Sequence, residues 1–211
     1  MLFHKNRHSR RNCLVRSAQD LHSFEEARPA RHMFGAEAGV ALGKALYKHA
    51  GLTEVYLSYL NLEDEGAVAI ANSLKETAPA LEVLEMAGND VTVEAAPTVS
   101  ACIAVKQNLR KLNLSENELK DEGAIQISKA LEEGHLQLNE VDLSTNSIGR
   151  VGARVLAQVV VQKPNFKLLN INDNCISDEG IDEDMFTEFW TDCSVQSWNA
   201  EQSSGCELQL K

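Results

Sequence analysis

A short apolar pattern occurs five times along the chain at nearly constant spacing. The copies LTEVYL, LEVLEM, LRKLNL, LNEVDL and FKLLNI begin at Leu52, Leu81, Leu109, Leu138 and Phe166. Successive copies therefore start 29, 28, 29 and 28 residues apart. A fixed period of this length indicates a solenoid, in which each unit can bury its apolar face only by stacking on its neighbours. This repeat constrains the fold more than any other feature of the sequence.

An asparagine follows most of these copies at a fixed place. Eight residues after the start, the first copy has Leu60, with Asn61 beside it. The other four copies have, at that position, Asn89, Asn117, Asn146 and Asn174. Neither an amphipathic helix nor a strand requires an asparagine there, but an amide at a chain turn can satisfy backbone groups that lack a partner. We therefore expect a structural asparagine ladder.

The second half of each unit has the periodicity of a helix. Small or apolar residues recur four apart at Gly66, Ile70 and Leu74, at Gly123, Ile127 and Leu131, and at Gly152, Leu156 and Val160. Each unit therefore reads as strand, turn and helix. A unit of this length with the pattern LxxLxLxxN and a full helix is typical of the α/β leucine-rich-repeat solenoid of ribonuclease-inhibitor type. In that fold parallel strands form the concave face and helices form the convex face.

The repeat pattern is weaker at both ends. Residues 24–51 keep an intact helical half, EAGVALGKALYKH, but Ala27 and Pro29 replace core leucines in the strand half, so this segment can at most form a sheet edge. At the other end Asp184 and Glu188 stand at helix core positions. We divide the chain into a basic leader (1–23), a decayed repeat (24–51), five repeats (52–184) and a tail or cap (185–211).

The leader differs in charge from the repeats. Residues 1–31 contain seven Lys or Arg and three acidic residues, whereas the whole chain has a formal net charge of -11. An Arg-rich start is compatible with an organelle transit peptide or a localisation signal, but a disordered leader is the simpler interpretation and the one we favour. The exposed apolar edge of the Leu52 unit would then favour self-association.

Several functional classes are disfavoured by the sequence. The acidic charge argues against a nucleic-acid ligand, and no apolar run is long enough for a membrane span. The histidines of the leader lack metal-ligand spacing, so we expect no metal and no cofactor. Five cysteines without CxxC spacing indicate reduced thiols. Because no nucleophile signature and no phosphate-binding loop is present, we do not expect the chain to be an enzyme in its own right.

The residues between the core leucines of each strand should face the concave side. This face is polar and mostly acidic, and concave solenoid surfaces usually bind proteins, here a basic partner, although a merely solvated face is the alternative. Acidic residues also open the helices. They are Glu63, Asp64, Glu65, Asp121, Glu122, Asp178 and Glu179. We expect them to cap free N–H groups there and to complement the helix dipole.

Four longer stretches carry a resemblance to a known family. YLSYLNLEDEGA (56–67), LEVLEMAGNDVTVEAA (81–96), KLNLSENELKDEGA (111–124) and KLLNINDNCISDEGI (167–181) resemble the leucine-rich-repeat region of plant-type Ran GTPase-activating proteins. The resemblance implies binding of the small GTPase Ran, activation of its GTP hydrolysis in support of nuclear transport, and a cytoplasmic or nuclear-envelope location. The resemblance further implies that members of this family order the GTPase's own glutamine, which positions the attacking water. An asparagine and an arginine on loops of their early repeats assist.

This sequence does not match the whole family pattern. The family's nuclear-envelope targeting domain, most of its early repeats and its acidic tail have no counterpart here, so no catalytic residue can be assigned and we expect weakened activation. The alternative is a protein-binding scaffold or an inactive fragment. As partner contacts on the concave face and the loops that follow the strands we select Glu54, Tyr56, Tyr59, Glu85, Asp90, Lys111, Glu116, Asp142 and Arg150.

Overall fold

The computed structural model describes residues 14–17, 35–176 and 207–209. Within these residues five helices alternate with the central strands of one seven-stranded sheet, whose order is β1-β2-β3-β4-β5-β6-β7. The strands are β1 (Leu14–Ser17), β2 (Leu52–Tyr56), β3 (Val83–Glu85), β4 (Lys111–Asn113), β5 (Glu140–Asp142), β6 (Leu168–Asn170) and β7 (Glu207–Gln209). The helices are α1 (Gly35–Leu46), α2 (Glu63–Thr77), α3 (Ala96–Ala104), α4 (Lys120–Glu132) and α5 (Arg150–Val160).

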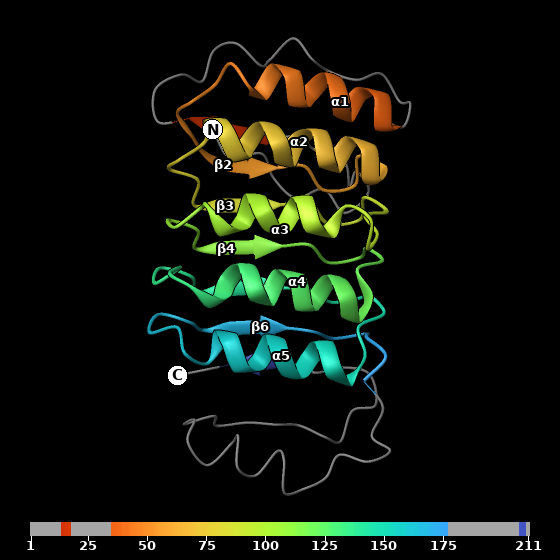
Figure 1. Cartoon of the computed structure of the whole chain (residues 1–211), viewed down its shortest axis with the longest axis vertical. Coiled ribbons are helices and arrows are strands. Elements are labelled where there is room, and N and C mark those ends of the chain that lie inside the picture. The colour runs from red at the N-terminus through yellow and green to blue at the C-terminus, as the bar shows by residue number, and fades with distance from the viewer. Residues whose placement is uncertain (1–13, 18–34, 177–206, 210–211) are drawn as a thin grey trace, which may run out of the picture.

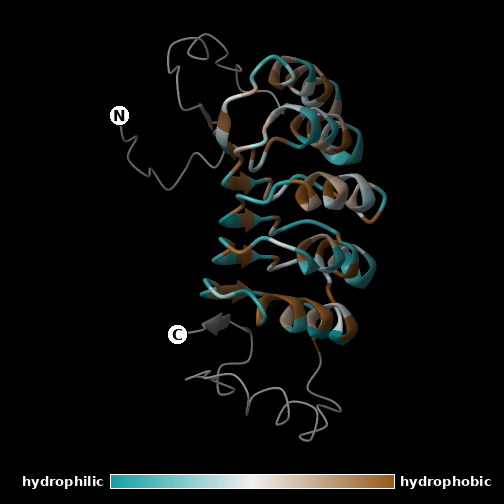
Figure 2. Ribbon diagram, turned by 60° about the vertical axis from the view of Figure 1, so that its left-hand side comes forward, coloured by the Kyte–Doolittle hydropathy of each residue, from teal (hydrophilic) through white to brown (hydrophobic). Residues whose placement is uncertain are grey.

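The strands and helices form two layers. Strands β2 to β6 pair in parallel with their immediate neighbours in the chain, and a helix follows each of β2 to β5 (Figure 1). The strands stack on one side of the molecule and the helices on the other (Figure 2). This is the leucine-rich-repeat solenoid of ribonuclease-inhibitor type that the sequence predicted.

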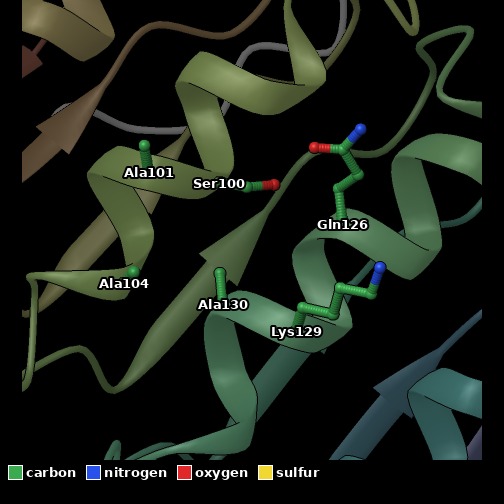
Figure 3. Close-up of a pocket in the computed structure, with 6 residues that line it drawn as sticks. All are labelled: Ser100, Ala101, Ala104, Gln126, Lys129 and Ala130. Atoms are coloured by element: carbon green, nitrogen blue, oxygen red, sulfur yellow. The ribbon is translucent and has the colours of Figure 1, made fainter.

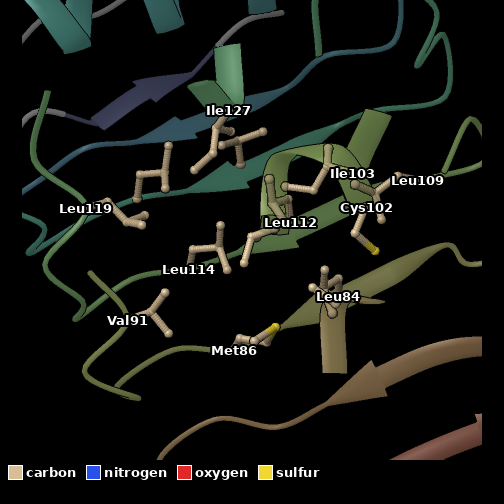
Figure 4. Packing of buried hydrophobic residues seen from close by; sticks show 14 of the residues in the cluster. Leu84, Met86, Val91, Cys102, Ile103, Leu109, Leu112, Leu114, Leu119 and Ile127 are labelled. Atoms are coloured by element: carbon tan, nitrogen blue, oxygen red, sulfur yellow. The ribbon is translucent and has the colours of Figure 1, made fainter. Parts of the chain in front are cut away.

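The core lies between the two layers. The middle residue of each short strand is buried, as in Leu84 and Leu112, while its neighbours on either side are half-buried. Helix residues at the predicted four-residue spacing meet them from the other layer, among them Ile127 (Figure 4). The spacing therefore identified the buried faces correctly, because it follows directly from the periods of strand and helix.

Helix α1 is the helical half that the sequence predicted for the decayed repeat. Its Leu42 and Leu46 are buried. It packs closely on α2, since a Cβ placed on Gly39 would lie 2.7 Å from the Cα of Gly66. The strand half of the decayed repeat lies outside the described residues, as do Asp184 and Glu188.

Both edges of the parallel sheet are occupied by strands from outside the repeats. Strand β1 pairs antiparallel with β2, and β7 pairs antiparallel with β6. The sequence assigned no strand to either segment, because four and three residues are too few for a periodic signal. The exposed apolar edge expected at the Leu52 unit is absent: Leu52 is 2% exposed and Val55 is fully buried.

Candidate partner-binding surface

Parallel register turns the repeats into columns of side chains on the strand face. One column runs through the second residue after each repeat start and contains Glu54, Val83, Lys111, Glu140 and Leu168. The next column contains Tyr56, Glu85, Asn113, Asp142 and Asn170. All ten residues are half-buried, and all except Val83 and Leu168 present polar side-chain groups to solvent while their backbones lie in the sheet.

Lys111 is the basic residue of these two columns, and it is held by two carboxylates. Its Nζ lies 3.3 Å from Oε1 of Glu85 and 2.9 Å from Oε1 of Glu140. Burial lowers the pKa of Lys111, but the hydrogen bond to Glu140 and the charges of Glu85 and Glu140 outweigh it, so the pKa lies above its ordinary value. Because the two carboxylates surround one ammonium group, the strand face keeps a negative balance at its centre.

Asp142 and Asn113 occupy equivalent places in neighbouring repeats and make the same local contacts. Oδ1 of Asp142 accepts hydrogen bonds from the backbone N–H of Ser144 at 3.0 Å and its hydroxyl at 2.7 Å. Oδ1 of Asn113 accepts the same pair from Ser115, at 3.0 and 2.8 Å. The two side chains differ in charge but not in position, so Asp142 adds a negative charge that the fold does not require.

A tyrosine spans three repeats along the loops that follow the strands. The hydroxyl of Tyr59 donates a hydrogen bond to Oε1 of Glu116, which lies two repeats further along the stack. Between them is Gly88, with φ +61°, and a Cβ at that position would clash with the Tyr59 ring. Tyr59 itself has φ 60° and Glu116 has φ 53°, a region that bulky residues rarely adopt. The ring therefore lies over Gly88 of the next repeat and bonds to Glu116 of the repeat after it.

The remaining selected residues are distributed over this surface and its border. The Tyr56 hydroxyl donates a hydrogen bond to Oε2 of Glu54 at 3.1 Å. Asp90 is exposed in the loop after β3, with φ 55°. Arg150 is the first residue of α5 and so belongs to the helix layer rather than to the strand columns. The structure thus brings Glu54, Tyr56, Glu85, Lys111 and Asp142 onto one face and Tyr59, Asp90 and Glu116 onto the adjoining loops. Their role as partner contacts stays a prediction.

The four asparagines form a ladder between repeats. Oδ1 of Asn89 accepts hydrogen bonds from the N–H groups of Leu60 and Leu62 in the preceding repeat, at 2.9 and 3.4 Å. Asn117 does the same for Asn89 and Val91, at 3.1 and 3.0 Å. Oδ1 of Asn174 accepts in the same way from Asn146 and Ile148, and Oδ1 of Asn146 accepts from Leu119. Each Nδ2 donates to carbonyl oxygens of its own and the preceding repeat. These side chains hold the stack together.

Two of the acidic residues at the helix starts, Asp64 and Asp121, act between repeats, which corrects our expectation for them, whereas Asp178 and Glu179 lie outside the described residues. Neither α2 nor α4 has a side-chain cap on its own N-terminus. Instead, Oδ1 of Asp121 accepts hydrogen bonds from the N–H groups of Gly149 and Gly152 at the start of the next helix, α5, at 2.8 and 2.9 Å. Asp64 likewise accepts from the N–H and hydroxyl of Thr92, both at 2.7 Å. As predicted, a carboxylate accepts hydrogen bonds from backbone N–H groups, but these groups belong to the next repeat and not to the same helix.

A second ladder, on the opposite side of the stack, was missed by the sequence analysis. Buried polar side chains stand three residues before the starts of the third, fourth and fifth repeats, namely Lys106, His135 and Lys163. Each reaches carbonyl oxygens at the end of the preceding repeat's helix. Lys106 donates to Lys75, and Lys163 donates to Glu132 and Gly134, at 3.1, 2.9 and 3.0 Å.

The third member of this ladder is a histidine. Nε2 of His135 lies 3.0 Å from the carbonyl oxygen of Ile103 at the end of α3. A cation or an N–H donor is favoured at this end of a helix, where carbonyl groups have no partner. Aligning the repeats by column would have revealed this position, because it holds a donor side chain in three successive units.

A hollow in the helix layer differs in its chemistry from the strand face. A shallow hollow of about 410 Å³ lies between α3 and α4, lined by Ser100, Ala101, Ala104, Gln126, Lys129 and Ala130 (Figure 3). Lys129 is the one titratable group of this lining, so the hollow contains no acid–base pair. Among the described residues no group of three His, Cys, Asp or Glu side chains could hold a metal ion. Over the same residues, no helix is long and apolar enough to cross a membrane.

The geometry defines a leucine-rich-repeat fold with a charged strand face. A family model described as "Leucine Rich repeat" matches residues 105–128 and 162–183. The repeat region is similar to plant Ran GTPase-activating proteins, as the sequence predicted. It is 68% identical to RAN GTPase-activating protein 2 of Arabidopsis thaliana over 126 residues, which are 60% of this chain and 23% of that protein. It is 64% identical to RAN GTPase-activating protein 1 of the same plant over 134 residues, 63% of this chain and 25% of that protein.

A solved structure shows the same architecture at much lower sequence similarity. The tropomodulin C-terminal domain from Caenorhabditis elegans covers 74% of this chain and 91% of its own, with a TM-score of 0.53 and 14% identity. That likeness shows the fold alone. The chain spans about a quarter of the length of the two Arabidopsis relatives.

Proposed function

We propose that this repeat region binds a small GTPase of the Ran type and promotes its hydrolysis of GTP, so that the chain regulates an enzyme rather than acting as one. The observation that carries the proposal is the 68% identity to RAN GTPase-activating protein 2. The tropomodulin domain keeps this architecture at 14% identity. An identity of 68% is far above what this fold requires, and it therefore supports a shared function for the matched region.

The charge of the strand face is consistent with a basic partner surface. Of the selected contacts on this face and its loops, Glu54, Glu85, Asp90, Glu116 and Asp142 are acidic. Lys111 is already paired with two carboxylates. Complementary potentials of this kind mainly raise the rate of association and exclude wrong partners. We therefore expect binding that weakens as salt is added.

Hydrolysis of GTP by purified Ran in a single turnover, with and without the chain, tests the proposal. We expect a saturable acceleration, with a rate between the intrinsic rate of Ran and that produced by the full-length Arabidopsis protein. The chain needs only to position groups of the GTPase for this, since phosphoryl transfer is limited by positioning and electrostatics. Binding to Ran without any acceleration would instead support a scaffold, and no binding at high protein concentration would refute the proposal.

Asp142→Asn tests the surface without disturbing the fold, because Asn113 shows that an asparagine makes the same contacts at this position. We expect the variant to bind Ran about twofold to fivefold more weakly, the range of a single exposed ion pair. Glu65→Gln removes the same charge from an exposed position on α2, in the helix layer, and is the matched control. Equal effects of the two substitutions would show that only the net charge matters and that the strand face is not the binding surface.

A further inference from the structure

The two outer edges of the parallel sheet are surfaces that accept an added strand. A strand at a sheet edge has backbone N–H and C=O groups that require partners, and an extended segment of another chain can supply them. In this structure the partners come from β1 at one edge and β7 at the other. Neither strand belongs to a repeat, since β1 precedes the decayed repeat (24–51) and β7 follows the fifth full repeat, which we end at residue 184.

The direction of the two strands distinguishes them from additional repeats. Every strand pair from β2 to β6 is parallel, because each unit returns through a helix before its next strand. Strands β1 and β7 both pair antiparallel. A further repeat would add a parallel strand and a helix, so an antiparallel strand ends the repeat array. At the β2 end α1 closes the helix layer in the same way, through its close contact with α2.

The hydrogen-bonding pattern identifies which backbone groups each edge presents. Leu57 donates its backbone N–H to Glu85 of β3. Backbone groups of alternate residues face opposite neighbours, so Glu54 and Tyr56 of β2 face β1. The register pairs Arg16 with Glu54 and Leu14 with Tyr56. The N–H of Arg16 is therefore directed at β2, and the N–H of Val15 is directed away from it.

The same reasoning applies to the other edge. Leu143 of the β5 repeat donates its N–H to the carbonyl oxygen of Asn170, so the backbone groups of Asn170 are directed at β5. Those of its neighbour Leu169 are directed at β7. Leu169 is paired in register with Leu208. The N–H of Leu208 is directed at β6, whereas the N–H of Gln209 is directed away.

We propose that β1 and β7 are intrachain caps on two strand-accepting edges, and that the partner they exclude is a second copy of this chain. An edge opened on β2 would pair with the same edge of another molecule. When two identical edges pair antiparallel, a two-fold axis relates the two molecules, and the assembly closes as a dimer. Opening both edges of one molecule would allow each to pair, so larger assemblies would form. The intact chain stays monomeric because both edges are occupied.

Proline substitution tests this proposal in the full-length chain, because proline lacks an N–H and is tolerated only where that N–H faces away from the neighbouring strand. Arg16→Pro and Leu208→Pro each remove a donor directed at the sheet. Val15→Pro and Gln209→Pro are the matched controls, since each removes a donor directed outward. The two readouts are solution mass over about a hundredfold range of concentration and amide hydrogen exchange in dilute protein.

For Arg16→Pro we expect exchange at the Glu54 and Tyr56 amides to become about tenfold faster or more, and the mass to double at high concentration. Val15→Pro should leave both measurements unchanged. The double variant Arg16→Pro with Leu208→Pro should form assemblies larger than a dimer. The proposal is overturned if Arg16→Pro and Val15→Pro behave alike, or if these two amides exchange without protection in the unmodified chain. Retained exchange protection at Leu112 in β4 shows that a variant is still folded.

Discussion

Removing the Asn117 side chain should destabilise the protein by about 3 kcal/mol, because it leaves buried donors without acceptors. Asn117 is 6% exposed. Its Oδ1 accepts from the N–H groups of Asn89 and Val91, and both residues are buried. In Asn117→Ala these two donors lose that acceptor, and each such loss costs about 1 to 3 kcal/mol.

The carbonyl side of the same site contributes less to the cost. Nδ2 of Asn117 donates to the carbonyl oxygens of Met86, Leu114 and Ser115. Leu114 also accepts from Asn146, and Ser115 also accepts from the N–H of Gly88, so these two keep a partner. Two donors and the Met86 carbonyl oxygen therefore lose a partner, and at about 1 kcal/mol each they give the expected total of about 3 kcal/mol.

Equilibrium unfolding in urea measures the effect. The midpoint should shift to lower urea with an unchanged slope, since the substitution changes stability rather than the surface exposed on unfolding. Glu118→Ala, at the next position in the sequence and exposed, is the control and should change stability by less than about 0.5 kcal/mol. If the two variants unfolded at the same urea concentration, the inter-repeat hydrogen bonds of Asn117 would not be present in solution.

Three further outcomes are expected. Lys163→Met should lower the unfolding free energy by about 1 kcal/mol at pH 7, because it removes buried hydrogen bonds. Burial lowers the pKa of Lys163, so the unfolded chain binds this proton more tightly than the folded chain does. The unmodified chain should therefore gain stability relative to the variant as the pH rises toward 10.5, which urea titrations at several pH values measure. Burial raises the pKa of Cys102 to about 11, so at pH 8 an alkylating reagent should modify the exposed Cys175 first and Cys102 only when the protein unfolds. Peptide mass spectrometry measures the two rates of modification, and equal rates would contradict the burial of Cys102. Gly88→Ala should lower the unfolding free energy by about 1 to 2 kcal/mol, because φ is +61° there and the added methyl group displaces Tyr59. A urea midpoint equal to that of the unmodified chain would contradict this prediction.

The sequence predicted those features that depend on period alone. Leu84, Leu112 and Ile127 are buried because the repeat register places them toward the opposite layer, and that register can be counted from the letters. It also predicted that Asn117 would serve the backbone at a turn. It could not show that the bonds cross from one repeat to the next, because the bonded residues are 26 to 28 positions apart.

Features that depend on how neighbouring repeats are placed were beyond sequence reasoning. Asp121 lies in the first turn of α4, where local rules assign it to its own helix. In the stack the start of α5 is within its reach, and Asp121 bonds to Gly149 and Gly152 instead. Lys106 was overlooked for the opposite reason: a lysine is ordinarily taken to be exposed, whereas here the end of α2 provides an acceptor that compensates its burial.

Three sets of side chains thus connect neighbouring repeats at three different places. The asparagines join the turns after the strands, Asp64 and Asp121 join the helix starts, and Lys106 and its equivalents join the helix ends. All three sets occur between the first and second repeats and between the third and fourth, and there they restrict relative rotation of the two units. The columns of the strand face are therefore held at constant spacing before a partner arrives. Binding on such a surface avoids much of the entropy cost of ordering a flexible one. This rigidity gives a charge such as that of Asp142 a fixed position from which to act on a partner.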